Sequence, residues 1–432
     1  MLAVFAAALT AACGGPSMTV RKNLDQYVAA EDYDHATAYL EQVKHEQYGP
    51  RNAVLYYLDA GTLLQHAGRF QDSDAAFDKA EQRMDELYTT SVSKAAATFL
   101  INDNMQDYSG EAFEHALVNI FRALNYAFLG RTDEALVEAR KVEVFLDEVT
   151  RRRGNRSVYK DDAFARYLDS LLYEDAGQAD DARISREAAD KAYGWYAAKY
   201  GTRAPQFDAA GAGDGEVVFI HYNGIGPRKV SKTLQVLWKD GVAAVRQMKA
   251  ETQDQQTQQQ IKNALAAGAA GNSITVAYPE FVQDPFVITA SDVQSEDRTS
   301  PTFLVEPISA IAVKDLQDRW LAVRARAVAR ATIKFMLARA AEKKAQTEGD
   351  YAAAITKRIA NAAEAATEVA DTRSWTTVPA QIRMARLAVA PGTHDLTVRF
   401  KDSKGAVVKS HVFKNVVVKR GKRTYLAYRT AQ

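Results

Sequence analysis

The sequence predicts an α+β multidomain protein: an N-terminal helical repeat region, then a strand-rich, sandwich-like domain with a long alanine-rich helical hairpin. Three observations predict it. Residues 18–200 contain a single proline and repeat apolar residues at helical spacing. After residue 216 the pattern changes to short strand-like segments separated by turn residues. Between these strands, residues 308–370 return to a helical period with much alanine. A 432-residue chain is long enough for two or three domains.

The chain begins with an apolar run, Met1 to Ala12, that ends at its single cysteine, Cys13. The run is too short to span a bilayer, which needs about 20 residues, but suits a signal-peptide core. The small residues Ala11 and Ala12 before the cysteine resemble the lipobox of bacterial lipoproteins. This resemblance implies that residues 1–12 are a signal peptide and that a diacylglycerol is attached to the thiol.

Residues 13–17 would then form a lipidated N-terminus. Thr10 stands where a lipobox usually has leucine, so an ordinary signal peptide followed by a free cysteine is the alternative. Gly14 follows the cysteine, and the aspartate that retains some lipoproteins at the inner membrane is absent. The expected location is therefore the periplasmic face of the outer membrane, with the membrane contacted through lipid.

Four segments share one pattern, in which a helix ends near Gly or Asp, a polar turn follows and a second helix begins. They are residues 29–43, 57–80, 119–142 and 166–189. Gly68, Gly130 and Gly177 fit the left-handed position after a helix, where a Cβ would clash. The pattern is similar to tetratricopeptide repeats, so residues 18–205 are expected to form a TPR-like solenoid. The longer middle interval predicts an inserted helix and loop at residues 88–114.

Such an array presents a concave groove. The predicted groove-facing residues of the last two repeats are all apolar or aromatic: Leu117, Ile120, Leu124, Phe164, Tyr167 and Leu171. This surface is too apolar to stay open to water. Either the insertion or the second domain packs on it, or it receives a helix of a partner protein. The sequence favours the first interpretation and leaves both open.

Residues 206–215 read as a linker that opens the second domain, residues 216–432. Strands are expected in eight segments: 216–224, 273–281, 285–291, 302–307, 382–390, 394–400, 406–419 and 423–430. Short antiparallel strands at this spacing predict a small sandwich. Two helices at 308–345 and 351–370 form the hairpin, at about 308–370. A basic stripe on the first of them, from Arg319 to Lys334, is either a solvated face or a surface for an anionic partner.

The segment ADTRSWTTVP (370–379) contains two candidate contact residues, Arg373 and Trp375. Arginine and tryptophan are common in protein–protein contacts. Alternatively, Arg373 pairs with Asp371 while Trp375 fills the seam between hairpin and sheet. We favour the seam.

No catalytic or cofactor motif is present. The sequence has no HExxH, no G-x-S-x-G, no P-loop and no strand-linked G-x-G-x-x-G. The net charge of +1 does not suggest nucleic acid. We therefore expect a non-enzymatic protein without metal or cofactor. His221, at the end of a strand, is the best candidate for a catalytic group, although a satisfied histidine in a tight turn is the simpler interpretation.

Several strings together are similar to a largely uncharacterised family of bacterial tetratricopeptide-repeat lipoproteins. They include GRFQDSDAAFDKAE (68–81), YSGEAFE (108–114), RALNYAFLG (122–130), HYNGIGP (221–227), ADTRSWTTVPAQI (370–382) and LAVAPGTHDLTV (387–398). Relatives tend to be encoded near lipoproteins that resemble penicillin-binding-protein activators or the curli secretion channel. The resemblance implies a role in an envelope assembly, with envelope proteins as partners.

The leading hypothesis is a lipid-anchored periplasmic scaffold or adaptor whose repeats bind another envelope protein. One alternative is a cell-wall enzyme that uses Asp371, Arg373, His221 or Glu216. Another is a structural subunit of a secretion or surface-appendage machine.

Overall fold

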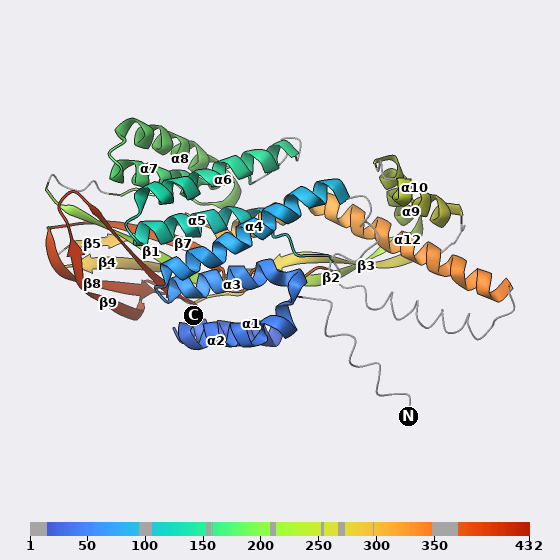
Figure 1. The fold of residues 1–432 in the computed structure, drawn as a ribbon, viewed down its shortest axis with the longest axis horizontal. Coiled ribbons are helices and arrows are strands. Elements are labelled where there is room, and N and C mark those ends of the chain that lie inside the picture. Colours follow the sequence, from blue (N-terminus) through green and yellow to red (C-terminus); the bar gives the residue numbers. More distant parts are fainter. Residues whose placement is uncertain are drawn as a thin grey trace, which may run out of the picture.

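The computed structural model describes residues 15–94, 106–152, 157, 159–207, 213–251, 255–266, 273–296, 298–347 and 370–432. The predicted signal peptide, Cys13 and nearly all of the second hairpin helix lie outside these residues, so those predictions stay predictions. Figure 1 shows a helical region formed by the first half of the chain and sheets formed by the second half. No helix in the described ranges combines the length and the apolar character needed to cross a bilayer.

The helical region consists of helix–turn–helix units. Its helices are α1 (Met18–Ala29), α2 (Tyr33–Val43), α3 (Ala53–His66), α4 (Phe70–Lys94), α5 (Ala112–Phe128), α6 (Thr132–Arg152), α7 (Ala163–Asp175) and α8 (Ala179–Tyr200). The three predicted turn glycines have φ of 74°, 70° and 76°, which a side chain would strain. The extra length predicted at 88–114 belongs partly to α4, which continues to Lys94.

In the described part of the second half, ten strands form three sheets. They are β1 (Gly215–Ile225), β2 (Arg228–Leu237), β3 (Ser273–Val282), β4 (Ala290–Ser295), β5 (Arg298–Pro301), β6 (Phe303–Glu306), β7 (Pro379–Val389), β8 (Gly392–Lys401), β9 (Val407–Val418) and β10 (Arg423–Thr430). Sheet A has the order β10-β1-β7-β6, and sheet C has the order β5-β4-β8-β9. The expectation of antiparallel pairing is wrong for β1 and β10, which run parallel from Glu216–Arg423 to Asn223–Thr430.

Sheet A is the middle layer of the molecule. On β1, Val218, Ile220 and Tyr222 belong to the apolar cluster that contains the helices. The alternate residues Val217 and Phe219 belong to a second cluster shared with β4, β8 and β9 of sheet C. Neighbouring residues of a strand point to opposite faces, so β1 is covered on both sides. The helices before Phe207 and the strands after Gly213 therefore share one core.

A third unit extends away from the rest of the molecule (Figure 1). It contains the β2–β3 pair with α9 (Trp238–Glu251), α10 (Gln255–Ala266) and α12 (Trp320–Thr347). The predicted helix at 308–345 is in fact two helices, because α11 (Ile308–Asp318) ends just before Arg319. Arg319 pairs with Glu111 and Asp315, and Arg330 is buried. The predicted basic stripe is therefore not one continuous surface.

Candidate functional site

The six predicted groove residues are all buried, none more than 3% exposed. They lie in the cluster that includes the helix-facing side of β1. The interpretation as an open surface for a partner helix is wrong in this structure, because these side chains pack in one core with residues of sheet A. The alternative interpretation, in which the second half of the chain packs on these six residues, agrees with the structure.

Arg373 and Trp375 are also inaccessible. Arg373 is 4% exposed and forms a two-pronged pair with Asp371, at 2.9 and 2.7 Å. Trp375 is fully buried, and its indole Nε1 donates to Thr62 Oγ1 at 3.0 Å. Its ring contacts Phe77 and Phe121 of the helical region. The seam it fills is thus between helices and sheet A, and the expected seam between hairpin and sheet is wrong.

A buried carboxylate fixes the backbone after Trp375. Asp59 Oδ1 accepts from the backbone N–H groups of Thr376 and Thr377, at 3.0 and 2.9 Å, and its other oxygen accepts from Tyr48 at 2.7 Å. Burial raises the pKa of Asp59, although these hydrogen bonds lower it in part. Residues 371–377 are therefore a structural strap across the helices.

The residues considered for a cell-wall enzyme belong to separate structural contacts. His221 is fully buried, and its two ring nitrogens contact Thr430 Oγ1 and Ser291 Oγ, both at 2.8 Å. Burial lowers the pKa of His221 far below its ordinary value, which keeps the imidazole neutral. Glu216 pairs with Arg386 and Arg423, each at 2.6 Å. Asp371 and Arg373 pair with each other, whereas His221 and Glu216 each contact other residues.

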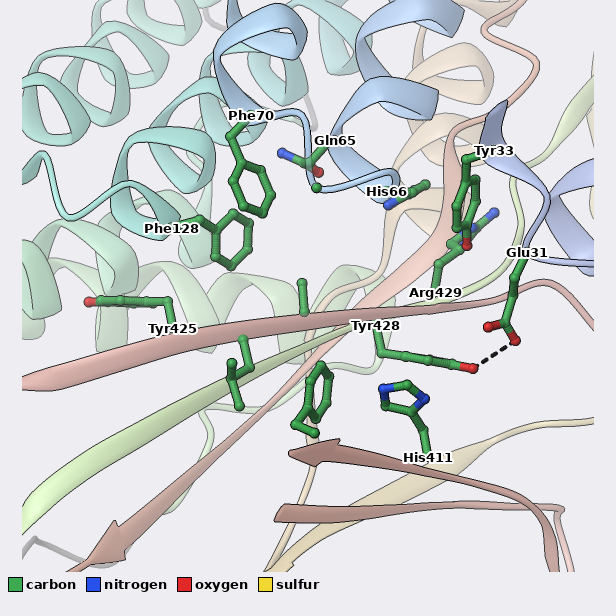
Figure 2. Close-up of a pocket in the computed structure, with 14 residues that line it drawn as sticks. Glu31, Tyr33, Gln65, His66, Phe70, Phe128, His411, Tyr425, Tyr428 and Arg429 are labelled. Carbon is green, nitrogen blue, oxygen red and sulfur yellow. Dashed lines mark hydrogen bonds between the residues drawn. The ribbon is translucent and has the colours of Figure 1, made fainter. Parts of the chain in front are cut away.

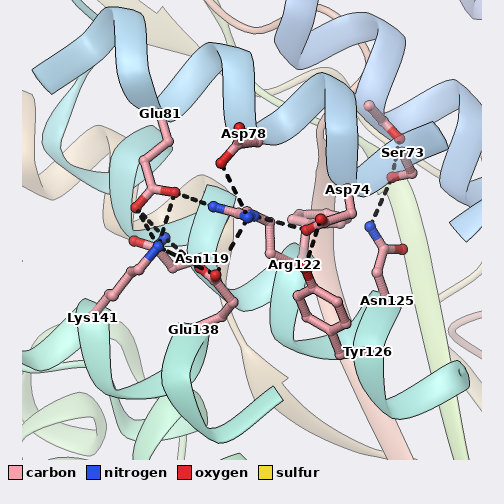
Figure 3. A network of polar contacts seen from close by, with 12 residues as sticks. Ser73, Asp74, Asp78, Glu81, Asn119, Arg122, Asn125, Tyr126, Glu138 and Lys141 are labelled. Carbon is pink, nitrogen blue, oxygen red and sulfur yellow. Dashed lines mark hydrogen bonds and ion pairs between the residues drawn. The ribbon is translucent and has the colours of Figure 1, made fainter. Parts of the chain in front are cut away.

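A charge network that the sequence did not reveal joins α4, α5 and α6 (Figure 3). Arg122 is at its centre and contacts Asp74 at 2.8 Å, Asp78 at 3.2 Å and Glu138 at 3.3 Å. Lys141 reaches Glu138 at 3.0 Å. Every charge here has an opposite partner, so the network holds helices together. Among the described residues, no group of three His, Cys, Asp or Glu could hold a metal ion.

The most promising site is a cavity of about 400 Å³ between the helix ends and the sheets (Figure 2). Its lining residues are Glu31, Tyr33, Gln65, His66, Gly68, Phe70, Phe128, His411, Phe413, Tyr425, Leu426, Ala427, Tyr428 and Arg429. Glu31 to Phe128 come from the ends of α2, α3, α4 and α5 and the turns between helices, and the others from β9 and β10. None of these residues was a predicted site residue.

The cavity runs along the edge of β10. Five consecutive residues, Tyr425 to Arg429, line it. Successive side chains of a strand point to opposite faces, so a cavity on one face would touch only every second residue. β10 is the outer strand of sheet A, and within the part of the chain that the structure describes its side away from β1 has no partner strand. The cavity therefore lies beside a free sheet edge.

Arg429 is an unpaired buried cation in this cavity. The residue is 3% exposed, and among the described residues neither Nε nor Nη1 has a hydrogen-bond partner. Asp25 interacts with it electrostatically, but that carboxylate contacts Arg21 at 3.7 Å. Burial lowers the pKa of Arg429 to about 10, so it remains charged at neutral pH. A buried charge without a partner is costly, so an anion from outside would be stabilised here.

The other titratable groups of the lining add no net charge. Glu31 pairs with Lys409 and accepts from the Tyr428 hydroxyl at 2.7 Å. Burial lowers the pKa values of His66 and His411, which favours neutral rings. His66 Nε2 is buried without a partner. In Figure 2 the side chain of Arg429 lies beside Tyr33 and His66.

Aromatic rings form the remaining walls. Phe70 and Phe128 stack with their centroids 4.8 Å apart at the ends of the helices. On the sheet side, Tyr428 lies 4.4 Å from the ring of His411. The cavity can therefore hold an apolar body together with one negative charge.

No family model matches the sequence, and no curated protein matches it. Among solved structures, one described as "MamA MSR-1 C2" aligns with 40% of this chain and 93% of its own, at 16% identity and a TM-score of 0.17. At that TM-score the likeness supports no conclusion on fold or function.

Proposed function

We propose that the protein is a lipid-anchored periplasmic adaptor that binds a segment of another envelope protein in the cavity beside β10. The observation that carries this proposal is Arg429, a buried cation without a partner in an aromatic cavity. The lipid anchor rests on Cys13 and the apolar run before it. The outer membrane is the proposed location, and membership of the bacterial tetratricopeptide-repeat lipoprotein family is part of the proposal.

The proposal also covers the finer architecture. The four helix–turn–helix units would form a TPR-like solenoid, with sheets A and C as a sandwich that fills its concave side. A solenoid filled in this way cannot use its groove for a partner. Recognition would then move to the end of the array, where the turns after α1, α3 and α5 face the edge of β10.

The size and chemistry of the cavity suit recognition of a short segment. Ligand sites usually measure about 300–1,000 Å³ and combine apolar walls with a few polar groups. At about 400 Å³ the cavity has room for a few side chains, but not for a helix. Its residues supply an anchor for charge and apolar contacts, and we propose binding without catalysis.

Photocrosslinking in cells tests the proposal. A benzophenone amino acid replaces Phe128 in the cavity wall, and in a matched control it replaces Val144, which is 68% exposed on α6. We expect an envelope protein to be crosslinked from position 128 only, to be lost in Arg429→Met, and to be reduced in Cys13→Ser. Equal crosslinking from both positions, unaffected by Arg429→Met, would remove the support for this site.

A further inference from the structure

We infer that the cavity receives an extended peptide segment, which adds as a further strand to the free edge of β10 and places a carboxylate on Arg429. This inference rests on the proposed function and specifies the chemistry of the partner.

The first step concerns the backbone of β10. It pairs with β1 along Arg423 to Thr430, and sheet A ends there. Within the described part of the chain, the backbone of Tyr425 to Arg429 makes no hydrogen bond to an element other than β1. In a strand, alternate N–H and C=O groups point to each side, so half of these groups face the cavity. They are available to an added strand.

The second step concerns the walls. A free edge invites pairing with any other strand unless something covers it. Here the helix ends stand on one side of β10, with Phe70 and Phe128, and β9 stands on the other, with His411 and Phe413. The space between these two walls borders the edge of β10. Tyr425 to Arg429 extend about 13 Å, at about 3.3 Å per residue, which accommodates about five residues of peptide.

The third step concerns charge. The guanidinium of arginine is always charged and carries five N–H donors, so it forms strong charge-assisted hydrogen bonds with a carboxylate. Among the described residues, Nε and Nη1 of Arg429 have no hydrogen-bond partner, so their N–H groups can donate to an added carboxylate. The other charged lining residue, Glu31, is already paired with Lys409. One free positive charge matches a singly charged carboxylate better than a doubly charged phosphate. The carboxylate can be the C-terminus of the segment or an Asp or Glu side chain.

Peptide libraries test the inference on the full chain. Three libraries of random nonapeptides are passed over the immobilised protein: one with a free C-terminus but no Asp or Glu, one amidated with Asp and Glu, and one amidated without them. We expect retention from the first or the second, which identifies the source of the carboxylate. The third should not be retained.

Two measurements on a retained peptide complete the test. Its Kd should rise at least tenfold in Arg429→Met, which removes the charge and every N–H donor of the side chain. Exchange of those amide hydrogens of Tyr425 to Arg429 that point away from β1 should slow at least tenfold on saturation. N-methylation of alternate peptide residues should abolish this protection. The exposed Val144→Ala variant serves as the control and should bind as the wild type does.

Retention of the library without a carboxylate, or equal binding by Arg429→Met, would overturn the claim that a carboxylate of the peptide binds Arg429. Unchanged exchange on β10 in a saturated complex would overturn strand addition, and so would the failure of every library to bind. If the photocrosslinked partner still depended on Arg429 in that case, the inference would fall while the proposed function stood. Loss of the crosslinked partner as well would remove both.

Discussion

Replacing Arg429 with methionine is expected to stabilise the protein in the absence of a ligand. Methionine keeps an unbranched apolar stem and removes a charge that has no ion pair within 4 Å among the described residues. Most buried charges behave in the opposite way, because removing one member of a buried pair leaves the other uncompensated. A rise in the free energy of unfolding therefore indicates a group kept for binding, and a fall indicates a group that stabilises the fold.

The magnitude follows from the cost of burial. Burial lowers the pKa of Arg429 from 12.5 to about 10. Each unit corresponds to about 1.36 kcal/mol, so the charged side chain destabilises the folded state by roughly 3 kcal/mol. Asp25 loses some attraction when the cation is removed, although Arg21 still faces it. We expect the free energy of unfolding to rise by about 1–3 kcal/mol.

Urea denaturation at pH 7 measures this change, and the same strand offers a matched control. Arg423 pairs with Asp175 at 2.7 Å, with Glu216 at 2.6 Å and with Glu174. Arg423→Met should therefore lower the free energy of unfolding by about 3–5 kcal/mol. If the free energy of unfolding of Arg429→Met were instead lower by about 2 kcal/mol or more, the guanidinium would stabilise the folded state. The claim that it is an unpaired binding group would then be refuted.

Three further predictions concern stability. Trp375→Ala should lower the free energy of unfolding by about 3–5 kcal/mol, because it empties a fully buried site, and a melt followed by circular dichroism at an unchanged temperature would contradict this. Asp169 has a pKa raised from 3.8 to about 7 by burial, so the folded state binds more protons and stability falls as the pH rises from about 4 to 7. Asp169→Asn should flatten that slope and gain about 1–3 kcal/mol at pH 8 and little at pH 4; an unchanged pH profile would argue against it. Burial alone would raise the pKa of Glu111, but Lys229 and Arg319 lower it below its ordinary value, so Glu111→Gln should cost about 2–4 kcal/mol. In Glu111→Gln, proteolysis should be faster in the β2–β3 unit than in the helices. Equal rates would argue against a stabilising pairing of Glu111 with Lys229 and Arg319.

The features that the sequence predicts well depend on local geometry. Gly68, Gly130 and Gly177 mark the helix turns, because a positive φ strongly favours glycine at that position. The strands at residues 382–430 could be placed because turn residues separate short alternating segments. In both cases a few neighbouring residues determine the structure.

The features that it predicts poorly depend on contacts between distant segments. The apolar groove residues indicated that something covers them, but not that β1 does. β1 is buried on both faces, so its sequence shows no alternation that would reveal which side faces the helices. Its parallel pairing with β10 joins segments far apart in the chain. Such pairing has no local signal.

The cavity illustrates the same limit at the level of one side chain. In β10, Arg429 shares a face with Tyr425 and Ala427, which pack on the helical core. The alternating pattern of β10 therefore predicts that Arg429 lies on the face of the strand that points to the core. Whether its guanidinium finds a partner depends on residues of α1 to α3, which are distant in sequence. The sequence does not distinguish a buried arginine that has an ion-pair partner from one that has none.

Hydrogen exchange of the Tyr425 to Arg429 amides that point away from β1, measured with and without a saturating carboxylate peptide, tests the central claim most directly. The account predicts that protection of these amides appears in the wild-type protein and is absent in Arg429→Met at the same peptide concentration. Binding that leaves the exchange of β10 unchanged, or protection that persists in Arg429→Met, would contradict it.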